Sequence, residues 1–155
     1  MVLLEENMLE FISRSTEQTQ RIGARLGTLL RGGDVICLQG PLGSGKTSFT
    51  QGIGRGWGAE QHLVSTSFVL IREYTRVEDE QRLYHIDLYR ISGAGEVWDL
   101  GVDDFLGNEY AVSVIEWAER MESLIPADHL WIKLDFVEPG DPSRRHLWFS
   151  AHGSR

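Results

Sequence analysis

The sequence predicts an α/β fold, a three-layer sandwich in which helices flank a mixed sheet with a parallel core and added antiparallel strands. Two observations support this prediction. A short apolar run leads into a glycine-rich loop and then a helical pattern, which is typical of a buried central strand. Elsewhere, β-rich segments are joined in pairs by polar turns, as in antiparallel hairpins. The 155 residues are about the length of one domain, so we expect a single domain over 1–155.

The first half of the chain predicts two helices around one strand. The first helix begins near Ser15 or Thr16, either of which can cap it, and the glycine pair at 32–33 stops it. The run at 34–39 suits a strand buried on both faces, and 46–58 predicts a second helix interrupted by glycines. The apolar face of the first helix consists of Ile22, Leu26, Leu29 and Leu30.

The second half of the chain predicts mainly strands. The turns VEDE and VEPGDPS each join two β-rich segments, which we expect to pair as hairpins or longer antiparallel connections. Residues 95–107 predict one or two short helices, and 110–117 is a run of apolar and small residues that ends at an acid. The β-rich segments lie at 67–76, 81–90, 129–136 and 144–151.

The loop GPLGSGKT at 40–47 matches the phosphate-binding pattern G-x-x-x-x-G-K-[ST], which makes the predicted fold P-loop NTPase-like. Backbone N–H groups of such a loop converge on a phosphate, and the following helix adds its positive end. We expect Lys46 to bridge the β- and γ-phosphates and Thr47 to complete a Mg²⁺ shell. A glycine turn beside an incidental lysine is the alternative. The expected nucleotide contacts are Gly40, Pro41, Leu42, Gly43, Ser44, Gly45, Lys46, Thr47 and Ser48.

Two acids lie at the ends of predicted strands, where they can meet the γ-phosphate side of the loop. Asp87 ends LYHID and Glu116 ends VSVIE. One acid can anchor the metal, and the other can ligate it or orient water. Solvated acids at strand ends are the alternative, and the P-loop favours the functional interpretation.

Three further residues beside these acids have open interpretations. His85 lies on the same strand face as Asp87, so it either bonds near the site or is a structural histidine. Arg90 can pair with a carboxylate or phosphate, or form a surface ion pair. Trp117 suits the core, although an aromatic ring at a strand end can also face a base or a partner.

Composition limits the classes of partner. The formal net charge of −8 opposes unaided binding to a polyanion, so any RNA is expected to be held by a partner. Cys37 is the only cysteine, which excludes an internal disulfide and a multi-thiolate zinc site, and we expect it to be a buried hydrophobe. We find no apolar run of about 18 residues and no secretory signal pattern, so we expect no membrane association and a cytoplasmic location.

Four motifs in order, the P-loop, STSF at 65–68, YHIDLYR at 84–90 and VIEW at 114–117, closely resemble the TsaE (formerly YjeE) family of small bacterial ATPases. The P-loop is generic, whereas HIDLYR followed by IEW is specific. The resemblance implies hydrolysis of ATP with Mg²⁺. It also implies TsaB-like and TsaD-like partners, with which this family makes threonylcarbamoyladenosine on tRNA. The TsaD-like partner carries out the transfer, the ATPase enables repeated turnover, and tRNA is reached only through the complex.

Carried over by position, the resemblance implies catalytic roles for Lys46, Asp87 and Glu116. It implies that Thr47, Asp87 and Glu116 hold the metal, with Asp87 as the Walker B-like acid. Trp117, beside Glu116, becomes a residue of the nucleotide site that is important for activity.

Among the remaining carried-over positions, the hydroxyl loop departs from the family pattern, whereas Arg144 and an N-terminal segment resemble it. Ser67 occupies the switch-threonine position of a loop that usually reads Ser-Pro-Thr, and Thr66 replaces the proline. Arg144 takes the place of a C-terminal arginine, and the segment 15–19 that of an N-terminal segment near the adenine. Ser65, Thr66 or Ser67 could each supply a hydroxyl to the metal or the γ-phosphate.

Two rival functions share the P-loop. A small-molecule or nucleotide kinase needs a second substrate pocket and commonly an arginine-bearing lid, whereas the candidate lid segments here are short and mixed in charge. A nucleotide-sensing module would bind the same ligand without turnover. A GTPase is disfavoured because the base-reading motif Asn-Lys-x-Asp is absent.

Overall fold

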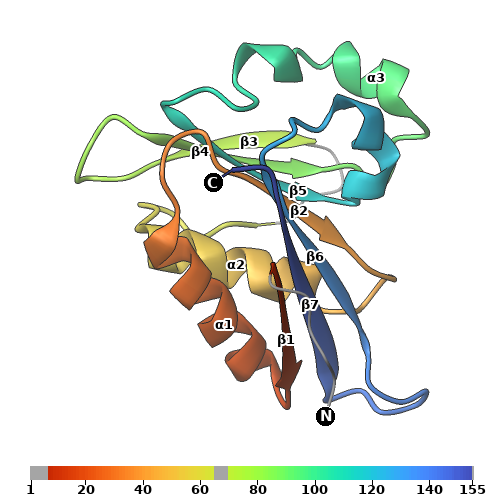
Figure 1. The fold of residues 1–155 in the computed structure, drawn as a ribbon. Coiled ribbons are helices and arrows are strands. Elements are labelled where there is room, and N and C mark those ends of the chain that lie inside the picture. Colours follow the sequence, from red (N-terminus) through yellow and green to blue (C-terminus); the bar gives the residue numbers. More distant parts are fainter. Residues whose placement is uncertain (1–6, 65–69, 155) are drawn as a thin grey trace.

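The computed structural model describes residues 7–64 and 70–154. Two helices from the first half of the chain lie on one side of the sheet, and a short helix from the second half lies on the other (Figure 1). The elements are β1 (Met8–Ser13), α1 (Thr16–Leu29), β2 (Val35–Gln39), α2 (Lys46–Trp57), β3 (Ile71–Thr75), β4 (Arg82–Asp87), α3 (Ala94–Trp98), η1 (Val102–Asp104), β5 (Ala111–Glu116), η2 (Ala118–Leu124), β6 (His129–Phe136) and β7 (Arg145–His152).

The sheet has seven strands in the order β1-β7-β6-β2-β5-β4-β3 among the residues described. β2 runs parallel to both β5 and β6, and β4 runs parallel to β5. The outer pairs β3–β4, β6–β7 and β1–β7 are antiparallel. The predicted α/β class, with a parallel core and antiparallel additions, is therefore confirmed, as are the two predicted hairpins.

β1 was not predicted from the sequence. It pairs along its whole length with β7, from Met8 opposite Ser150 to Ser13 opposite Arg145. As an edge strand it leaves Leu9 and Phe11 partly exposed. Because an edge strand is only partly buried, its sequence does not need the continuous apolar run that marked β2. Its pairing depends on a strand at the far end of the chain.

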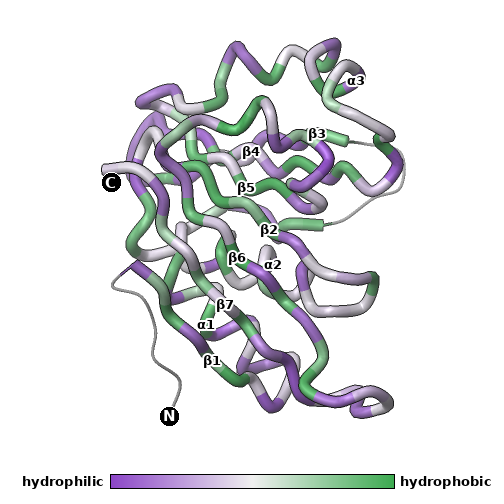
Figure 2. Tube along the Cα trace, turned by 45° about the vertical axis from the view of Figure 1, so that its right-hand side comes forward, coloured by the Kyte–Doolittle hydropathy of each residue, from purple (hydrophilic) through white to green (hydrophobic). Residues whose placement is uncertain are grey.

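Two apolar cores lie on the two faces of the sheet and explain its layered arrangement. One core packs Phe49, Ile53 and Trp57 of α2 against the inner strands. The other lies beneath α3, η1 and η2 and includes Cys37 and Met121. In Figure 2 the apolar colouring runs through β2 and β5, which are buried over most or all of their length.

Cys37 has no exposed surface, and burial raises the pKa of its thiol to about 12. The prediction that it is a buried hydrophobe is confirmed.

The α1 helix begins as predicted and ends earlier than predicted. Ser15 is its N-cap, and the Ser15 hydroxyl oxygen accepts a hydrogen bond of 3.1 Å from the backbone N–H of Gln18. The helix ends at Leu29, and Leu30 already has an extended backbone. Leu29 is 70% exposed, so its expected place on the packing face was wrong.

Glycines, rather than leucines, make the closest contact of α1 with α2. A Cβ atom on Gly23 would lie 2.4 Å from the carbonyl oxygen of Phe49, and one on Gly27 would lie 2.3 Å from that of Ile53. On α2, a Cβ on Gly52 would lie 2.1 Å from the carbonyl oxygen of Gln20. The two backbones therefore touch, which fixes the helix whose first turn carries Lys46 and Thr47.

Candidate functional site

The glycine-rich loop fills the space between the end of β2 and the first residue of α2. Gly43 and Gly45 adopt left-handed conformations, with φ of 80° and 103°. A Cβ atom on Gly40 would lie 2.2 Å from the carbonyl oxygen of Leu134, so only glycine fits there. The predicted order of strand, loop and helix is confirmed, and it directs the first turn of α2 toward the carboxyl end of the parallel strands.

Lys46 is buried, and its ammonium group is held by the loop itself. It donates hydrogen bonds to the carbonyl oxygens of Gly40 and Pro41, the latter at 2.9 Å. Burial lowers the pKa of Lys46, and the negative charges of Glu116, Glu119 and Asp87 oppose that shift. A desolvated cation that donates to carbonyl oxygens can exchange these partners for phosphate oxygens.

The two predicted acids are paired in register on adjacent strands. Asp87 ends β4 opposite Glu116, which ends β5, and Glu116 is also the register partner of Leu38 on β2. Because these strands are parallel, both carboxylates lie at the edge of the sheet from which the loop emerges. The structure therefore brings Asp87 and Glu116 together beside the loop, as the sequence predicted.

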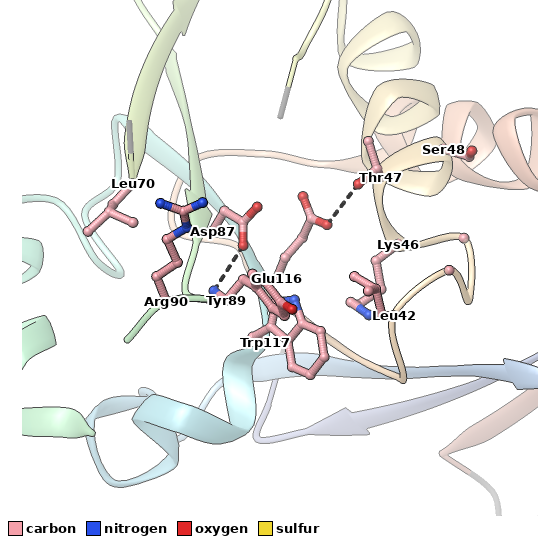
Figure 3. A pocket seen from close by; sticks show the side chains of 12 residues that line it. Leu42, Lys46, Thr47, Ser48, Leu70, Asp87, Tyr89, Arg90, Glu116 and Trp117 are labelled. Atoms are coloured by element: carbon pink, nitrogen blue, oxygen red, sulfur yellow. Dashed lines mark hydrogen bonds between the residues drawn. The ribbon is translucent and has the colours of Figure 1, made fainter. Parts of the chain in front are cut away.

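Glu116 contacts the loop through Thr47. The Thr47 hydroxyl donates a hydrogen bond of 3.3 Å to Oε1 of Glu116, while Oδ1 of Asp87 accepts one of 3.0 Å from the backbone N–H of Tyr89 (Figure 3). In Figure 3, Lys46 and Thr47 lie on one side, Asp87 on the other, and Glu116 between them. The arrangement presents a hydroxyl and two carboxylates to a common space.

That space is an open pocket of about 560 Å³. Both acids and Lys46 line it, together with the exposed side chains of Tyr89 and Arg90. Ser48 also lines it, whereas Gly40 and Pro41 line a smaller depression of about 320 Å³ that Trp117 lines as well. The pocket is lined by Leu42, Gly43, Gly45, Lys46, Thr47, Ser48, Leu70, Asp87, Tyr89, Arg90, Glu116 and Trp117.

The oxygen donors at this pocket fit a magnesium ion. Mg²⁺ commonly takes one or two carboxylates and completes its shell with water and substrate phosphate, so a hydroxyl and two carboxylates suffice. Within 7–64 and 70–154, no three or more histidine, cysteine or acidic residues gather into a complete metal cage. Thr47, Asp87 and Glu116 would therefore hold the ion together with phosphate, rather than alone.

Trp117 has an unusual backbone and two cationic neighbours. It is the one non-glycine residue with positive φ in the described chain, at φ 60° and ψ 40°. The ammonium of Lys46 lies 4.2 Å from the centre of one of its rings, and the guanidinium of Arg120 lies 4.8 Å away. Such strain is found where a side chain must be aimed in a fixed direction, here into the pocket wall.

Arg120 connects the two acid-bearing strand ends, and sequence reasoning missed it. Its guanidinium donates to the carbonyl oxygens of Leu88 and Tyr89, just after Asp87. It thus ties the segment after β4 to the segment after β5. Nothing in its position three residues after Trp117 predicted that it would contact the backbone of Leu88 and Tyr89.

His85 is the hydrogen-bonding partner of Glu116. The distance between Nε2 of His85 and Oε2 of Glu116 is 2.5 Å, and both side chains are buried. Of the two roles that the sequence left open for this histidine, the structure therefore places it in contact with a candidate catalytic acid.

The two arginines at the start of β7 differ in their contacts. Arg144 pairs with Asp141 at 2.7 Å and with Glu138 at 3.6 Å, and it is not part of the pocket lining. Arg145, which sequence reasoning did not name, donates a 3.1 Å hydrogen bond to the carbonyl oxygen of Gly43 and lies over the ring of Phe136. The arginine beside the loop is therefore Arg145.

The candidate hydroxyl loop, including Ser65, Thr66 and Ser67, lies outside the described residues. No helix in the described part of the chain is long and apolar enough to cross a membrane.

Comparison with known proteins identifies the family. The model of the family described as "Threonylcarbamoyl adenosine biosynthesis protein TsaE" matches residues 13–146. The chain is 35% identical over 130 residues to "tRNA threonylcarbamoyladenosine biosynthesis protein TsaE" from Treponema pallidum, covering 84% of this chain and 93% of that protein. It is 38% identical over 139 residues to the protein of the same name from Streptomyces coelicolor, covering 88% of this chain and 92% of the relative.

A solved structure agrees with these matches. The crystal structure of YdiB from Bacillus subtilis superposes with a TM-score of 0.74 at 32% identity, over 94% of this chain and 86% of that one. The likeness supports a P-loop NTPase-like fold. From the family match, the relatives and the shared fold together, we conclude that this chain belongs to the TsaE family.

Proposed function

We propose that this protein is an ATPase that hydrolyses ATP with Mg²⁺ and supports the formation of threonylcarbamoyladenosine on tRNA, together with TsaB-like and TsaD-like partners. One observation carries the hydrolytic part of the proposal. Lys46 and Thr47 in the first turn of α2 meet Asp87 and Glu116, two register partners on parallel strands, at one pocket. This set combines a phosphate-binding cation with the oxygen ligands of a divalent metal.

In this proposal, loop N–H groups and Lys46 bind the β- and γ-phosphates, and Thr47 with the two acids holds Mg²⁺. The ion supplies positive charge that neutralises the phosphate oxygens. Water attacks the γ-phosphorus, and the bond from that phosphorus to the β–γ bridging oxygen breaks to give ADP, phosphate and a proton. The residues act by position and charge, since phosphoryl transfer needs little covalent help from the protein.

The pocket is open, which favours partners that complete it. Leu42 and Tyr89 line it and remain 69% and 46% exposed. Apolar and aromatic side chains at the mouth of a site are suited to contact with another protein. The family name and the names of the relatives support the tRNA modification pathway as the setting.

Release of phosphate from ATP by the purified protein, alone and with a TsaB–TsaD-like assembly, tests the proposal. We expect slow release that depends on Mg²⁺ and changes on mixing. An unchanged rate, together with no detectable complex, would count against the partners. Transfer of labelled phosphate to an added nucleoside monophosphate would favour a kinase, and tight binding with no turnover in any mixture would favour a sensing module.

A further inference from the structure

We propose that His85 is a positioning residue that holds the Glu116 carboxylate in the orientation needed for turnover. The kinetic part of this inference depends on the proposed ATPase function. The geometric part concerns the protein without nucleotide and can be tested separately.

The contact joins two adjacent central strands below the pocket. His85 lies on β4 two residues before Asp87, so its side chain is on the same face of the sheet as that of Asp87. Its register partner on β5 is Val114, two residues before Glu116. The 2.5 Å contact therefore runs diagonally between the strands, from His85 up to the carboxylate at the strand end.

The two oxygens of Glu116 have different partners. Oε2 meets Nε2 of His85, while Oε1 accepts the hydrogen bond from Thr47 in the first turn of α2. An ionised carboxylate only accepts hydrogen bonds, so with Glu116 ionised the imidazole donates from Nε2. With Oε2 held in this way, Oε1 is directed toward Thr47 and the pocket.

Burial makes this restraint effective. The side chains of His85 and Glu116 are 4% and 3% exposed, so water has little access to replace a lost donor. A buried carboxylate oxygen that loses its donor bears a desolvation penalty, so the orientation set by that contact is no longer favoured. The imidazole thus acts on the site through Glu116, and it does not itself line the pocket.

A second histidine–glutamate contact provides a matched control. His146 on β7 contacts Glu10 on β1, and these two strands lie at the edge of the sheet farthest from β4. This pair is partly exposed, at 21% and 17%, and neither residue lines the pocket at the loop. Replacing His146 removes a contact of the same chemistry without reaching Glu116.

The test compares His85→Ala, His85→Gln and His146→Ala with the unmodified chain. We measure kcat for ATP, the calorimetric dissociation constant for Mg-ATP, and thermal unfolding. For His85→Ala we expect kcat to fall about 10- to 100-fold, as when a group that orients a metal ligand is lost, with the dissociation constant within about twofold. Gln can place an amide N–H near the position of Nε2, so His85→Gln should recover much of the rate. His146→Ala should retain it.

A nucleotide-free measurement separates this inference from the proposed function. We expect the ring ¹⁵N resonances of His85 to show a protonated, hydrogen-bonded Nε2 that shifts on Glu116→Gln and does not shift on Glu10→Gln. If the unmodified chain fails to hydrolyse ATP while this signature is present, the proposed function fails and the contact stands. Equal kcat in His85→Ala and the unmodified chain would overturn the positioning role, as would loss of Mg-ATP affinity in proportion to kcat, or a His85 resonance insensitive to Glu116.

Discussion

The ammonium nitrogen of Lys46 lies 4.2 Å from the centre of a Trp117 ring while it also donates to the carbonyl oxygens of the loop. The cation that is expected to bind phosphate is therefore held against an aromatic side chain that lines the same pocket. Any ligand that draws Lys46 away from the ring changes the electrostatic environment of the indole.

We expect Mg-ATP to change the tryptophan emission of the protein through Trp117. The phosphates attract the Lys46 ammonium and so alter the field at the indole. A fluorescence titration measures this effect, and Trp117→Phe should remove most of the change. Trp98→Phe, at a 54% exposed position, is the matched control and should preserve it. A nucleotide-induced change that persists undiminished in Trp117→Phe would contradict the assignment.

The two acids should matter more for turnover than for binding. We expect Asp87→Asn and Glu116→Gln each to lower kcat about 100-fold, because a neutral amide holds the metal that neutralises the phosphate oxygens less well than a carboxylate does. Affinity for the nucleotide should change by less, since the loop and Lys46 remain. The rate of phosphate release gives kcat, and calorimetry gives the dissociation constant for Mg-ATP. Asp103→Asn and Glu80→Gln, at exposed positions away from the pocket, serve as controls. Full activity in both acid variants would remove them from the site.

The contact between α1 and α2 should be highly sensitive to added volume. For Gly52→Ala we expect a loss of about 2–4 kcal/mol in the free energy of unfolding, because the new methyl group would lie 2.1 Å from the carbonyl oxygen of Gln20. Gly95→Ala in α3 is the control, since nothing lies within 4 Å of its Cβ position, and it should change stability by less than about 1 kcal/mol. Urea unfolding of both variants provides the comparison, and equal stabilities would mean that the helix backbones do not touch.

Cys37 should be unreactive in the folded protein. Burial raises its pKa to about 12, so at pH 8 almost none of the thiol is ionised in the native state, whereas the unfolded thiol ionises readily. The pKa is raised on folding, so the associated stability is present below the unfolded pKa and is lost as pH rises toward the folded value. Labelling with a thiol reagent at pH 8 should be slow in buffer and fast in denaturant. Rapid labelling of the native protein would contradict the buried position.

Much of the fold could be predicted because local patterns mark it. The apolar run of β2 followed by the loop at 40–47 located the centre of the sheet, and polar turns located the two hairpins. The acids Asp87 and Glu116 could be predicted because each ends a β-rich segment. In these cases the signal lies within about ten residues of the feature.

The remaining features depend on residues that only the folded chain brings together. β1 is stabilised by pairing with β7, and its short sequence MLEFIS alone did not reveal it, because it has neither a strict alternation nor a long apolar run. Ile22, Leu26 and Leu30 pack on the core as predicted, whereas the exposure of Leu29 and the close glycine contacts between α1 and α2 could not be predicted from the helical spacing. The partner of His85 follows from the register of β4 against β5. Likewise, Arg145 rather than its neighbour reaches the loop because of the strand pairing at the start of β7.

Calorimetric titration of the folded protein with ATP and Mg²⁺ shows whether a triphosphate binds in the pocket beside Lys46, on which every proposed role depends. We predict saturable binding that Lys46→Ala abolishes while the thermal unfolding of that variant still shows a folded protein. Absence of binding heat from the unmodified protein at about 1 mM Mg-ATP, confirmed at a second temperature, would rule out a nucleotide site at this loop.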